Sequence, residues 1–297
     1  MKILVTGSSG LIGTALTTRL RSQGHEVVAL VRRPPATGEV RWDPAGGTID
    51  AGGLTGIDGV VHLAGAGIGD HRWSDSYRRE LVESRMRSTD LLARTLAGLD
   101  HRPSVLLSGS AVGWYGDRGD ASLDESSSGA DDFLGKLCHD WEAATQPAQA
   151  AGIRVGHLRT GIVLAPKGGA LGKMLPLFKL GLGGRFGNGR QVQSWISLDD
   201  EVGAIVHLLT ADVAGPVNLT APNPVTNTEF TRTLAHVLKR PAIFRVPKFA
   251  PRLVLGHDMA DALLFTGQRV LPTKLLAAGY AFEHSTLEQA LRATLKR

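Results

Sequence analysis

The stretch Thr6-Gly7-Ser8-Ser9-Gly10-Leu11-Ile12-Gly13 stands between a short apolar run at residues 2–6 and an amphipathic pattern that starts at residue 11. Its glycines have the spacing G-x-x-G-x-x-G. Gly7 allows a tight turn, Gly10 lets a phosphate approach the backbone, and Gly13 lets a helix pack closely on a strand. The N-terminus of that helix offers free N–H groups to anions. A glycine-rich turn without a ligand can share this spacing, but the strand–turn–helix context favours dinucleotide binding.

The residues after the second expected strand, Glu26–Val31, indicate which dinucleotide fits. Proteins that bind NAD usually place an acid there to hold the ribose hydroxyls. This chain has Arg32 and Arg33 instead, and two guanidinium groups suit the 2′-phosphate of NADP. Each charge-assisted hydrogen bond contributes roughly 1.5–3 kcal/mol. The alternative is a pair of exposed surface arginines; we expect NADP in preference to NAD.

Apolar runs and helical patterns alternate along the first half of the chain, which is typical of parallel βαβ units. Strands are expected at Lys2–Thr6, Glu26–Val31, Gly59–Ala64, Ser104–Ser108 and Arg154–Leu158. Helices are expected at Leu11–Gln23, Ser74–Leu99 and Asp132–Ala151, followed by a short helix at Leu171–Leu180, a helix at Asp199–Thr210 and a strand at Pro216–Leu219.

The second half of the chain has a different pattern, which is mainly helical from Asn227 and is interrupted by prolines at 241, 247, 251 and 272. We therefore expect the α/β fold class: a Rossmann-type doubly wound parallel sheet with a smaller, mainly helical C-terminal substrate lobe. The NADP-binding domain would take residues 1–160 plus about 190–220. The lobe would take about 161–190 and 221–297.

Composition excludes several classes of protein. The net charge of +5 comes from scattered basic residues among acids, so we expect no nucleic-acid partner. No apolar run approaches the ~20 residues of a membrane helix, and no secretory signal precedes the first strand. The single cysteine, Cys138, forms no internal disulfide. We expect a cytoplasmic protein without a membrane partner, and we assign no metal ligand.

Several motifs, taken in order, resemble a known class. The glycine turn, HLAGA at 62–66 and LLSGSAVGWYG at 106–116 are similar to the strand ends of extended short-chain dehydrogenases and nucleotide-sugar epimerases. The stretches HLAGAGIGDHRW, SRMRST, DFLGKLCHDWE, HLRTGIVL and SWISLDD resemble, more narrowly, the bacterial and organellar subgroup labelled "epimerase family protein". That subgroup carries a distinct C-terminal segment, and residues 249–297 look similar to it.

This resemblance implies a set of site residues. Leu63, Ala64 and Gly65 would line the adenosine and ribose side of the cofactor, and Ser110 falls at the place of the catalytic serine. Arg159, Thr160 and Gly161 would follow the strand that faces the nicotinamide. Together with the glycine turn, the expected cofactor-binding residues are Thr6, Gly7, Ser9, Gly10, Leu11, Ile12, Gly13, Arg32, Arg33, Leu63, Ala64, Gly65, Ser108, Arg159, Thr160 and Gly161.

The sequence departs from the class at its acid/base pair. Members use a tyrosine whose pKa is lowered by a lysine four residues later, and this chain has no Tyr-x-x-x-Lys. If Glu142 keeps the acid that often follows the lysine, Leu134 and Cys138 occupy the two catalytic places. Neither replaces the phenol or the ammonium, and loss of a general acid/base costs roughly 10²–10⁴ in rate. Tyr115 is our candidate catalytic substitute; the alternative is a packed aromatic residue beside Trp114.

Four residues are expected to reach the substrate. Arg72 and Trp73 follow the HLAGAGIGD stretch and would enter the cleft. Arg85 stands where many relatives have an asparagine; there it would bind a carboxylate or phosphate, or form a salt bridge on the helix surface. Trp195 lies in a segment that borders the substrate in relatives. The following Asp199–Asp200 pair shares that segment, or it only caps a helix.

Two functions remain open. The first is an NADP-dependent oxidoreductase or epimerase-like enzyme of the atypical extended type, acting on a small oxygenated substrate that could be anionic. The second is a non-catalytic NADP(H)-binding regulatory or sensor protein, which the missing Tyr/Lys pair favours. Relatives often form homodimers through the helices here at Ser74–Leu99 and Asp132–Ala151; the apolar stripes of these helices fit an internal core equally well.

Overall fold

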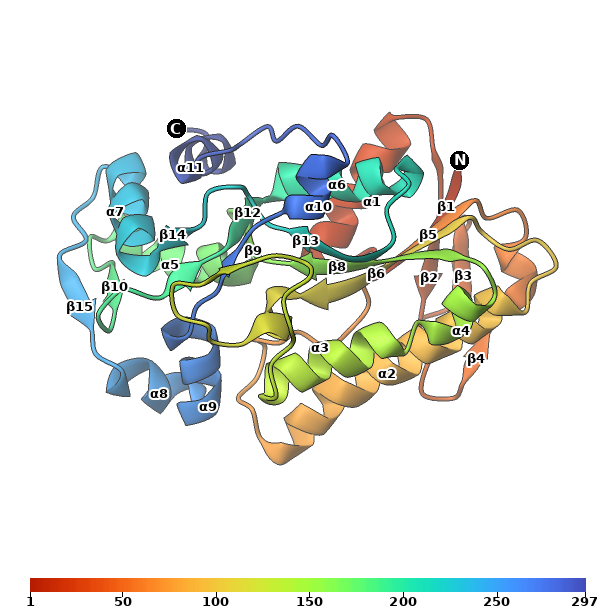
Figure 1. Cartoon of the computed structure of the whole chain (residues 1–297), viewed down its shortest axis with the longest axis horizontal. Helices are drawn as coiled ribbons and strands as arrows, with labels where there is room; N and C mark the ends of the chain where they lie inside the picture. The colour runs from red at the N-terminus through yellow and green to blue at the C-terminus, as the bar shows by residue number, and fades with distance from the viewer.

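The computed structural model describes all 297 residues and has a sheet of 8 strands at its centre (Figure 1). The strands are β1 (Lys2–Thr6), β2 (Glu26–Val31), β3 (Glu39–Asp43), β4 (Thr48–Ile49), β5 (Gly59–His62), β6 (Val105–Ala111), β8 (Arg154–Thr160) and β13 (Gly215–Leu219). Their order is β13-β8-β6-β5-β1-β2-β3-β4. Every neighbouring pair is parallel except β3 and β4.

This order confirms the predicted fold class. The chain adds β2 and β3 on one side of β1 and then β5, β6, β8 and β13 on the other. A doubly wound sheet of this kind opens a crevice at the carboxyl ends of its strands, where the direction of winding reverses. The reversal lies between β1 and β5, so the glycine turn after β1 lies at the crevice.

Helices cover both faces of the sheet (Figure 1). One layer holds α1 (Leu11–Ser22) and α6 (Leu198–Thr210), and the other holds α2 (Asp75–Ala97), α3 (Phe133–Ala143) and α4 (Gln146–Ala150). Local sequence fixes where these helices begin. Ser74 Oγ accepts the N–H of Tyr77 at 3.2 Å to start α2, and Asp132 accepts the N–H of Gly135 at 2.8 Å to start α3. Each cap satisfies an N–H that has no partner within its helix.

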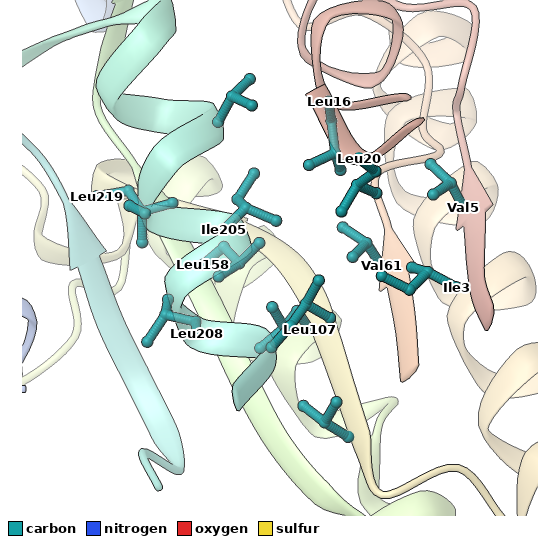
Figure 2. Close-up of a cluster of buried hydrophobic side chains, with 14 of the residues drawn as sticks. Ile3, Val5, Leu16, Leu20, Val61, Leu107, Leu158, Ile205, Leu208 and Leu219 are labelled. Carbon is teal, nitrogen blue, oxygen red and sulfur yellow. The ribbon is translucent and has the colours of Figure 1, made fainter. Parts of the chain in front are cut away.

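The largest apolar core lies between the sheet and the layer of α1 and α6. Figure 2 shows Leu16 and Leu20 of α1 gathered with side chains of the strands and of α6. Leu16, Leu20 and Ile205 have no exposed surface. Burying a side chain of this size contributes roughly 1.5–3 kcal/mol, so this cluster holds the first helix, and with it the glycine turn, firmly on the sheet.

A second core lies between the sheet and α2. Leu92 and Leu96 of the α2 apolar stripe are completely buried in it, and Leu81 is also fully buried. We therefore interpret this stripe as internal core. A homodimer stays a prediction. No helix of the structure is both long enough and apolar enough to span a membrane.

The remaining elements build a second lobe at the other end of the molecule (Figure 1). They are β9 (Ile162–Leu164), α5 (Gly169–Lys179), β10 (Gly184–Phe186), β11 (Val192–Gln193), β12 (Trp195–Ser197), β14 (Val225–Thr226), α7 (Asn227–Leu238), β15 (Phe244–Val246), α8 (Phe249–Leu255), α9 (His257–Ala260), a π-helical turn (Asp261–Phe265) and α11 (Leu287–Leu295). The segments β7 (Ser122–Leu123), β16 (Arg269–Val270) and α10 (Thr273–Ala277) connect this lobe to the sheet. The boundary near residue 160 stays a prediction.

In the first domain, the elements differ from the sequence predictions mainly in three respects. The expected helix Asp132–Ala151 is broken into α3 and α4, because Pro147 lies near the start of α4 and cannot continue α3 without interruption. Strands β3 and β4 are absent from the predictions because they are short, with 5 and 2 residues, although the alternation in Glu39–Asp43 fits a half-buried strand. Strands β6 and β8 run on to Ala111 and Thr160, whereas β5 ends early at His62.

Candidate cofactor and substrate site

The glycine turn has the steric requirements expected of a phosphate cradle. Gly7 has φ of +66°, and a Cβ placed on it would lie 2.8 Å from the carbonyl carbon and oxygen of Leu63. A Cβ on Gly13 would lie 2.1 Å from the Gly7 oxygen. On Gly10 it would meet only that same oxygen, at 3.2 Å. Gly7 and Gly13 are therefore required by packing, whereas Gly10 keeps open the space above the turn.

The N-terminus of α1 is bare. Gly10 is its N-cap residue and supplies no side-chain acceptor, and no acid is present in the first turn. Ser9 and Gly10 are exposed, and Leu11 is half-buried. Unpaired N–H groups at a helix start, together with the positive end of the helix dipole, attract an anion. This end of α1 can therefore hold a phosphate.

Thr6 fixes the loop that runs beside the glycine turn. Its Oγ1 accepts N–H groups from Leu63 at 3.1 Å and Ala64 at 3.2 Å, and it bonds to His62 Nδ1 at 2.7 Å. Burial, and then the charge of Arg85, lower the pKa of His62 to about 3, so the ring is neutral. Because Thr6 already accepts two N–H groups, its own proton points to Nδ1. His62 Nε2 then donates to Thr89, 2.9 Å away.

The two arginines after β2 are not equivalent. Arg33 donates to both carboxylate oxygens of Glu39 at 2.7 and 2.6 Å, which raises the pKa of Arg33 and lowers that of Glu39. Arg32 is exposed and takes part in no ion pair. Of the two, only Arg32 lacks an ion pair, and the role predicted for both arginines at the 2′-phosphate stays a prediction. Glu39 is close to Arg33 in both sequence and space. Its carboxylate neutralises part of the positive charge at this edge of the sheet.

A buried network surrounds the predicted catalytic serine. Ser110 Oγ donates to Glu142 Oε1 at 2.7 Å. Arg159 donates to the same carboxylate through Nε at 2.8 Å and Nη2 at 2.9 Å. Its Nη1 donates to the Tyr115 hydroxyl at 3.0 Å, which in turn donates to Asn218 Oδ1 at 2.6 Å. Burial acts to lower the pKa of Arg159, but Glu142 raises it overall.

This network changes two predicted roles. Tyr115 has no exposed surface, and burial raises the pKa of its hydroxyl. The structure therefore favours the packed-aromatic alternative for Tyr115 over an acid/base role. The guanidinium of Arg159 is 3.9 Å from the Trp114 ring centre and bound to Glu142, so it orders the network and does not extend into the crevice.

The two places of the missing pair hold apolar groups. Burial raises the pKa of the Cys138 thiol to about 12, and its Sγ points to the Ala111 carbonyl oxygen at 3.6 Å. A thiol of this kind is neutral and poorly reactive. Leu134 instead faces a pocket between the lobes. The acid/base pair is thus absent in space as well as in sequence.

The pocket beside Leu134 has a volume of about 340 Å³, a size that fits a small ligand. It lies between the start of α3 and the turns after α8. Its lining residues are Trp73, Arg78, Gly113, Gly116, Asp132, Phe133, Leu134, His257, Asp258, Asp261, Ala262, Thr266 and Gln268. The C-terminal segment therefore forms one wall, and sequence reasoning did not assign any residue of that wall to the site.

The four expected substrate residues have different positions. Trp73 lines the pocket. Arg72 donates to the carbonyl oxygen of Val254 at 2.7 Å and joins α8 to the first domain. Trp195 has no exposed surface and packs in the core of the second lobe; this placement contradicts direct contact with a substrate. Arg85 is buried and forms no surface salt bridge, so that alternative is wrong.

Two further acids were not recognised as partners from sequence. Asp200 is completely buried and accepts the N–H groups of Glu283 and His284 at 2.7 and 3.0 Å. It ties the C-terminal segment to α6; the cap of this helix is Ser197, whose Oγ accepts the Asp200 N–H at 3.0 Å, and not the Asp199–Asp200 pair. Glu201 is also completely buried, and it accepts the Thr160 hydroxyl at 2.9 Å. Burial raises the pKa of Glu201 to about 8. No local pattern marks either contact.

Comparisons with known proteins agree with this geometry. The model of the NAD dependent epimerase/dehydratase family matches residues 3–220, and a domain of unknown function, DUF1731, matches residues 246–294. Epimerase family protein Mb2239 of Mycobacterium bovis is 46% identical over 291 residues, which cover 97% of this chain and 96% of the relative. Epimerase family protein SDR39U1 of Homo sapiens is 39% identical over 297 residues, with 98% and 99% covered.

One solved structure of a similar fold was determined with NADPH. The crystal structure of human epimerase family protein SDR39U1 (isoform 2) with NADPH has a TM-score of 0.92 and 36% identity, and the match covers 100% of this chain and 99% of that one. The UDP-glucose 4-epimerase of Thermotoga maritima, with a TM-score of 0.79 and 17% identity over 100% and 98% of the two chains, shares the fold. Because the family model matches residues 3–220 and the relatives match almost the whole chain, the chain belongs to the NAD dependent epimerase/dehydratase family.

Proposed function

We propose that this protein binds NADP(H) across the carboxyl edge of its sheet and acts as an oxidoreductase or epimerase on a small oxygenated substrate. The observation that carries the proposal is the bare N-terminus of α1 behind the glycine turn, where Gly10 leaves space and no acid repels a phosphate. Ser108 Oγ, buried within β6 beside the last residue of β5 and without a hydrogen-bond partner, fits a polar ligand group in this part of the sheet.

The preference for NADP over NAD rests on Arg32 in this proposal. Arg32→Met should weaken NADPH binding about tenfold and leave NADH binding unchanged, because one charge-assisted contact to the 2′-phosphate is lost. Glu39→Gln should strengthen NADPH binding, since it releases Arg33 from its ion pair. Calorimetric titration with both cofactors measures these changes. Equal loss of NADPH and NADH affinity in Arg32→Met would show that Arg32 does not read the phosphate.

The proposed substrate site is the pocket beside Leu134. A bound NADP(H) would supply hydride exchange at its nicotinamide ring. The chain contributes Trp73 and Leu134 as apolar walls and His257 as a side chain able to exchange a proton. Histidine is the residue most often used in general acid–base catalysis, and His257 Nε2 lies 3.8 Å from Asp261 Oδ2, whose carboxylate is held by Arg252.

Ser110 has a more demanding role here than in relatives that have the Tyr/Lys pair. Its single proton is donated to Glu142, so the hydroxyl has to turn before it can donate to a substrate oxygen. Glu142 keeps the two hydrogen bonds from Arg159 when this happens. The turn therefore exchanges one hydrogen bond for another and leaves no buried carboxylate without a partner.

The test is a screen of NADPH oxidation with small carbonyl compounds as substrates. The compounds are chosen in pairs of similar size, one anionic and one neutral. Ser110→Ala should lower turnover on any substrate found by roughly 10²-fold, in the range for removal of one polarising donor. Full turnover by this variant would remove Ser110 from the mechanism.

A second function is favoured by the positions of Tyr115 and Cys138. The Tyr115 hydroxyl is completely buried, and the place of the catalytic lysine holds the inert thiol of Cys138. In this second function the protein binds NADP(H) without chemistry and reports its presence to a partner. Tight NADPH binding combined with no oxidation across the screen, in the wild type and in a His257→Gln variant alike, would favour this function over the first.

A further inference from the structure

Arg85 is a charged side chain that the fold buries without an acidic partner. Only 8% of its surface is exposed. The ion pairs of α2 use Arg78, Arg87 and Arg94 and do not include it. Its one hydrogen bond runs from Nη1 to the Leu81 carbonyl oxygen at 3.0 Å, and its Nε is buried with no partner. Most of the five N–H donors of this guanidinium are therefore uncommitted within the chain.

A buried guanidinium destabilises the fold unless an acceptor or an opposite charge compensates its charge. Taking one ion out of water costs several kcal/mol in a protein after relaxation. Burial lowers the pKa of Arg85, but a guanidinium does not lose its proton under ordinary conditions. The chain supplies no carboxylate to it. The unused donors therefore point to acceptor atoms on a ligand.

The surroundings hold this guanidinium in one place. Its central carbon lies 4.8 Å from the centre of the Trp141 ring. On the other side, a Cβ added to Gly65 would lie 3.4 Å from Cγ and Cζ of Arg85. Gly65 follows β5 in the loop that touches the glycine turn through Leu63. Arg85 is thus fixed beside the crevice, at the ends of β5 and β6, and not at the adenosine edge beyond β2.

Arg85 also lies next to the place of the missing lysine. Cys138 occupies that place on α3, and the two side chains influence each other: Arg85 acts to lower the pKa of Cys138, against the larger effect of burial. Ser110 is a further neighbour of Cys138. A cation is therefore present where relatives have one, but it comes from α2 and not from α3.

We propose that Arg85 replaces the α3 lysine as the cation that holds the nicotinamide-ribose half of NADP(H), through the ribose oxygens. The inference rests on the proposed function, because it requires the dinucleotide to lie in this crevice. It assigns the buried guanidinium a positioning and binding role in the cofactor site, separate from the substrate role expected from the sequence.

Two ligands distinguish a role of Arg85 at the nicotinamide ribose from a general structural role. NADPH contains both halves of the cofactor, whereas 2′,5′-ADP contains the adenosine half alone. Arg85→Met should weaken NADPH binding about tenfold to a hundredfold, the value of one charge-assisted hydrogen bond, and leave 2′,5′-ADP binding unchanged. Arg85→Lys should bind NADPH more tightly than Arg85→Met, because it keeps the cation. Isothermal titration calorimetry of the full chain measures the affinities of the wild type and the two variants for both ligands.

The matched control is Arg87→Met, which removes an arginine on the same helix from an exposed pair with Glu83 and should leave both affinities unchanged. The proposal is overturned if Arg85→Met binds NADPH as the wild type does. It is also overturned if NADPH and 2′,5′-ADP are weakened equally, since that pattern indicates a structural role. If the wild type binds neither ligand, the proposed function itself fails.

Discussion

Replacing Arg159 with methionine should lower the free energy of unfolding by about 3–5 kcal/mol, because it leaves the carboxylate of Glu142 buried without its main partner. The side chains of Arg159 and Glu142 are only 3% and 8% exposed. Two hydrogen bonds from the guanidinium to this carboxylate are lost, and the Tyr115 hydroxyl loses its donor as well. Urea unfolding at neutral pH measures the change.

The double variant Arg159→Met, Glu142→Leu should recover much of this loss. With both charges removed, no buried carboxylate is left uncompensated, and apolar replacements of similar volume are often neutral. A double-mutant cycle gives the coupling between the two residues. Arg87→Met serves as the surface comparison, with an expected change below about 1 kcal/mol. A change that small in Arg159→Met would mean that the network does not stabilise the fold.

The second large effect is a dependence of stability on pH that comes from Glu201. Its pKa is about 8 in the folded protein, against an ordinary value of 4.5, because burial disfavours the charged form. The folded state therefore holds this proton more tightly than the unfolded state between these two values. Stability falls as the pH rises through that window and levels off above the folded pKa.

Glu201→Gln should remove this part of the pH dependence. The amide keeps an oxygen that accepts the Thr160 hydroxyl, so the two proteins should be similarly stable near pH 5. At pH 9 the variant should be more stable by roughly 5 kcal/mol, from about 1.4 kcal/mol for each unit of pKa shift. Unfolding across this range measures the difference between the two proteins, in which other titrating groups cancel. A difference that does not change with pH would contradict the burial argument for Glu201.

Local patterns were sufficient for the parts of the site that are local. Gly7, Gly10 and Gly13 lie within one turn and helix start, so their spacing alone predicts the tight turn and close helix packing that the structure shows. The Tyr-x-x-x-Lys pair would lie within one helix, so its absence can likewise be read from the local sequence. Leu134 and Cys138 were placed at the two catalytic positions from sequence, and in the structure they are a pocket wall and a buried thiol.

The predictions that the structure changed concern contacts between different strands and helices. Glu39 neutralises Arg33 because β3 pairs beside β2, and β3 was not predicted. Tyr115 is buried because Asn218 and Arg159 come to it from β13 and β8. Trp195 fills the core of the second lobe. An aromatic or charged side chain has the same local pattern whether it faces a crevice or a core.

The sequence by itself determined the α/β class, the site of the glycine turn and the family resemblance, because each depends on residue types at short, fixed spacings. Only the tertiary structure decided which charges are paired and which are buried without an acidic partner. Burial and hydrogen bonding depend on elements that meet across the sheet or between the lobes, as Ser110, Glu142 and Arg159 do. Arg85 is the one arginine of α2 that is buried, and its burial without an acidic partner follows only from the packing of α2 against Gly65 and Trp141.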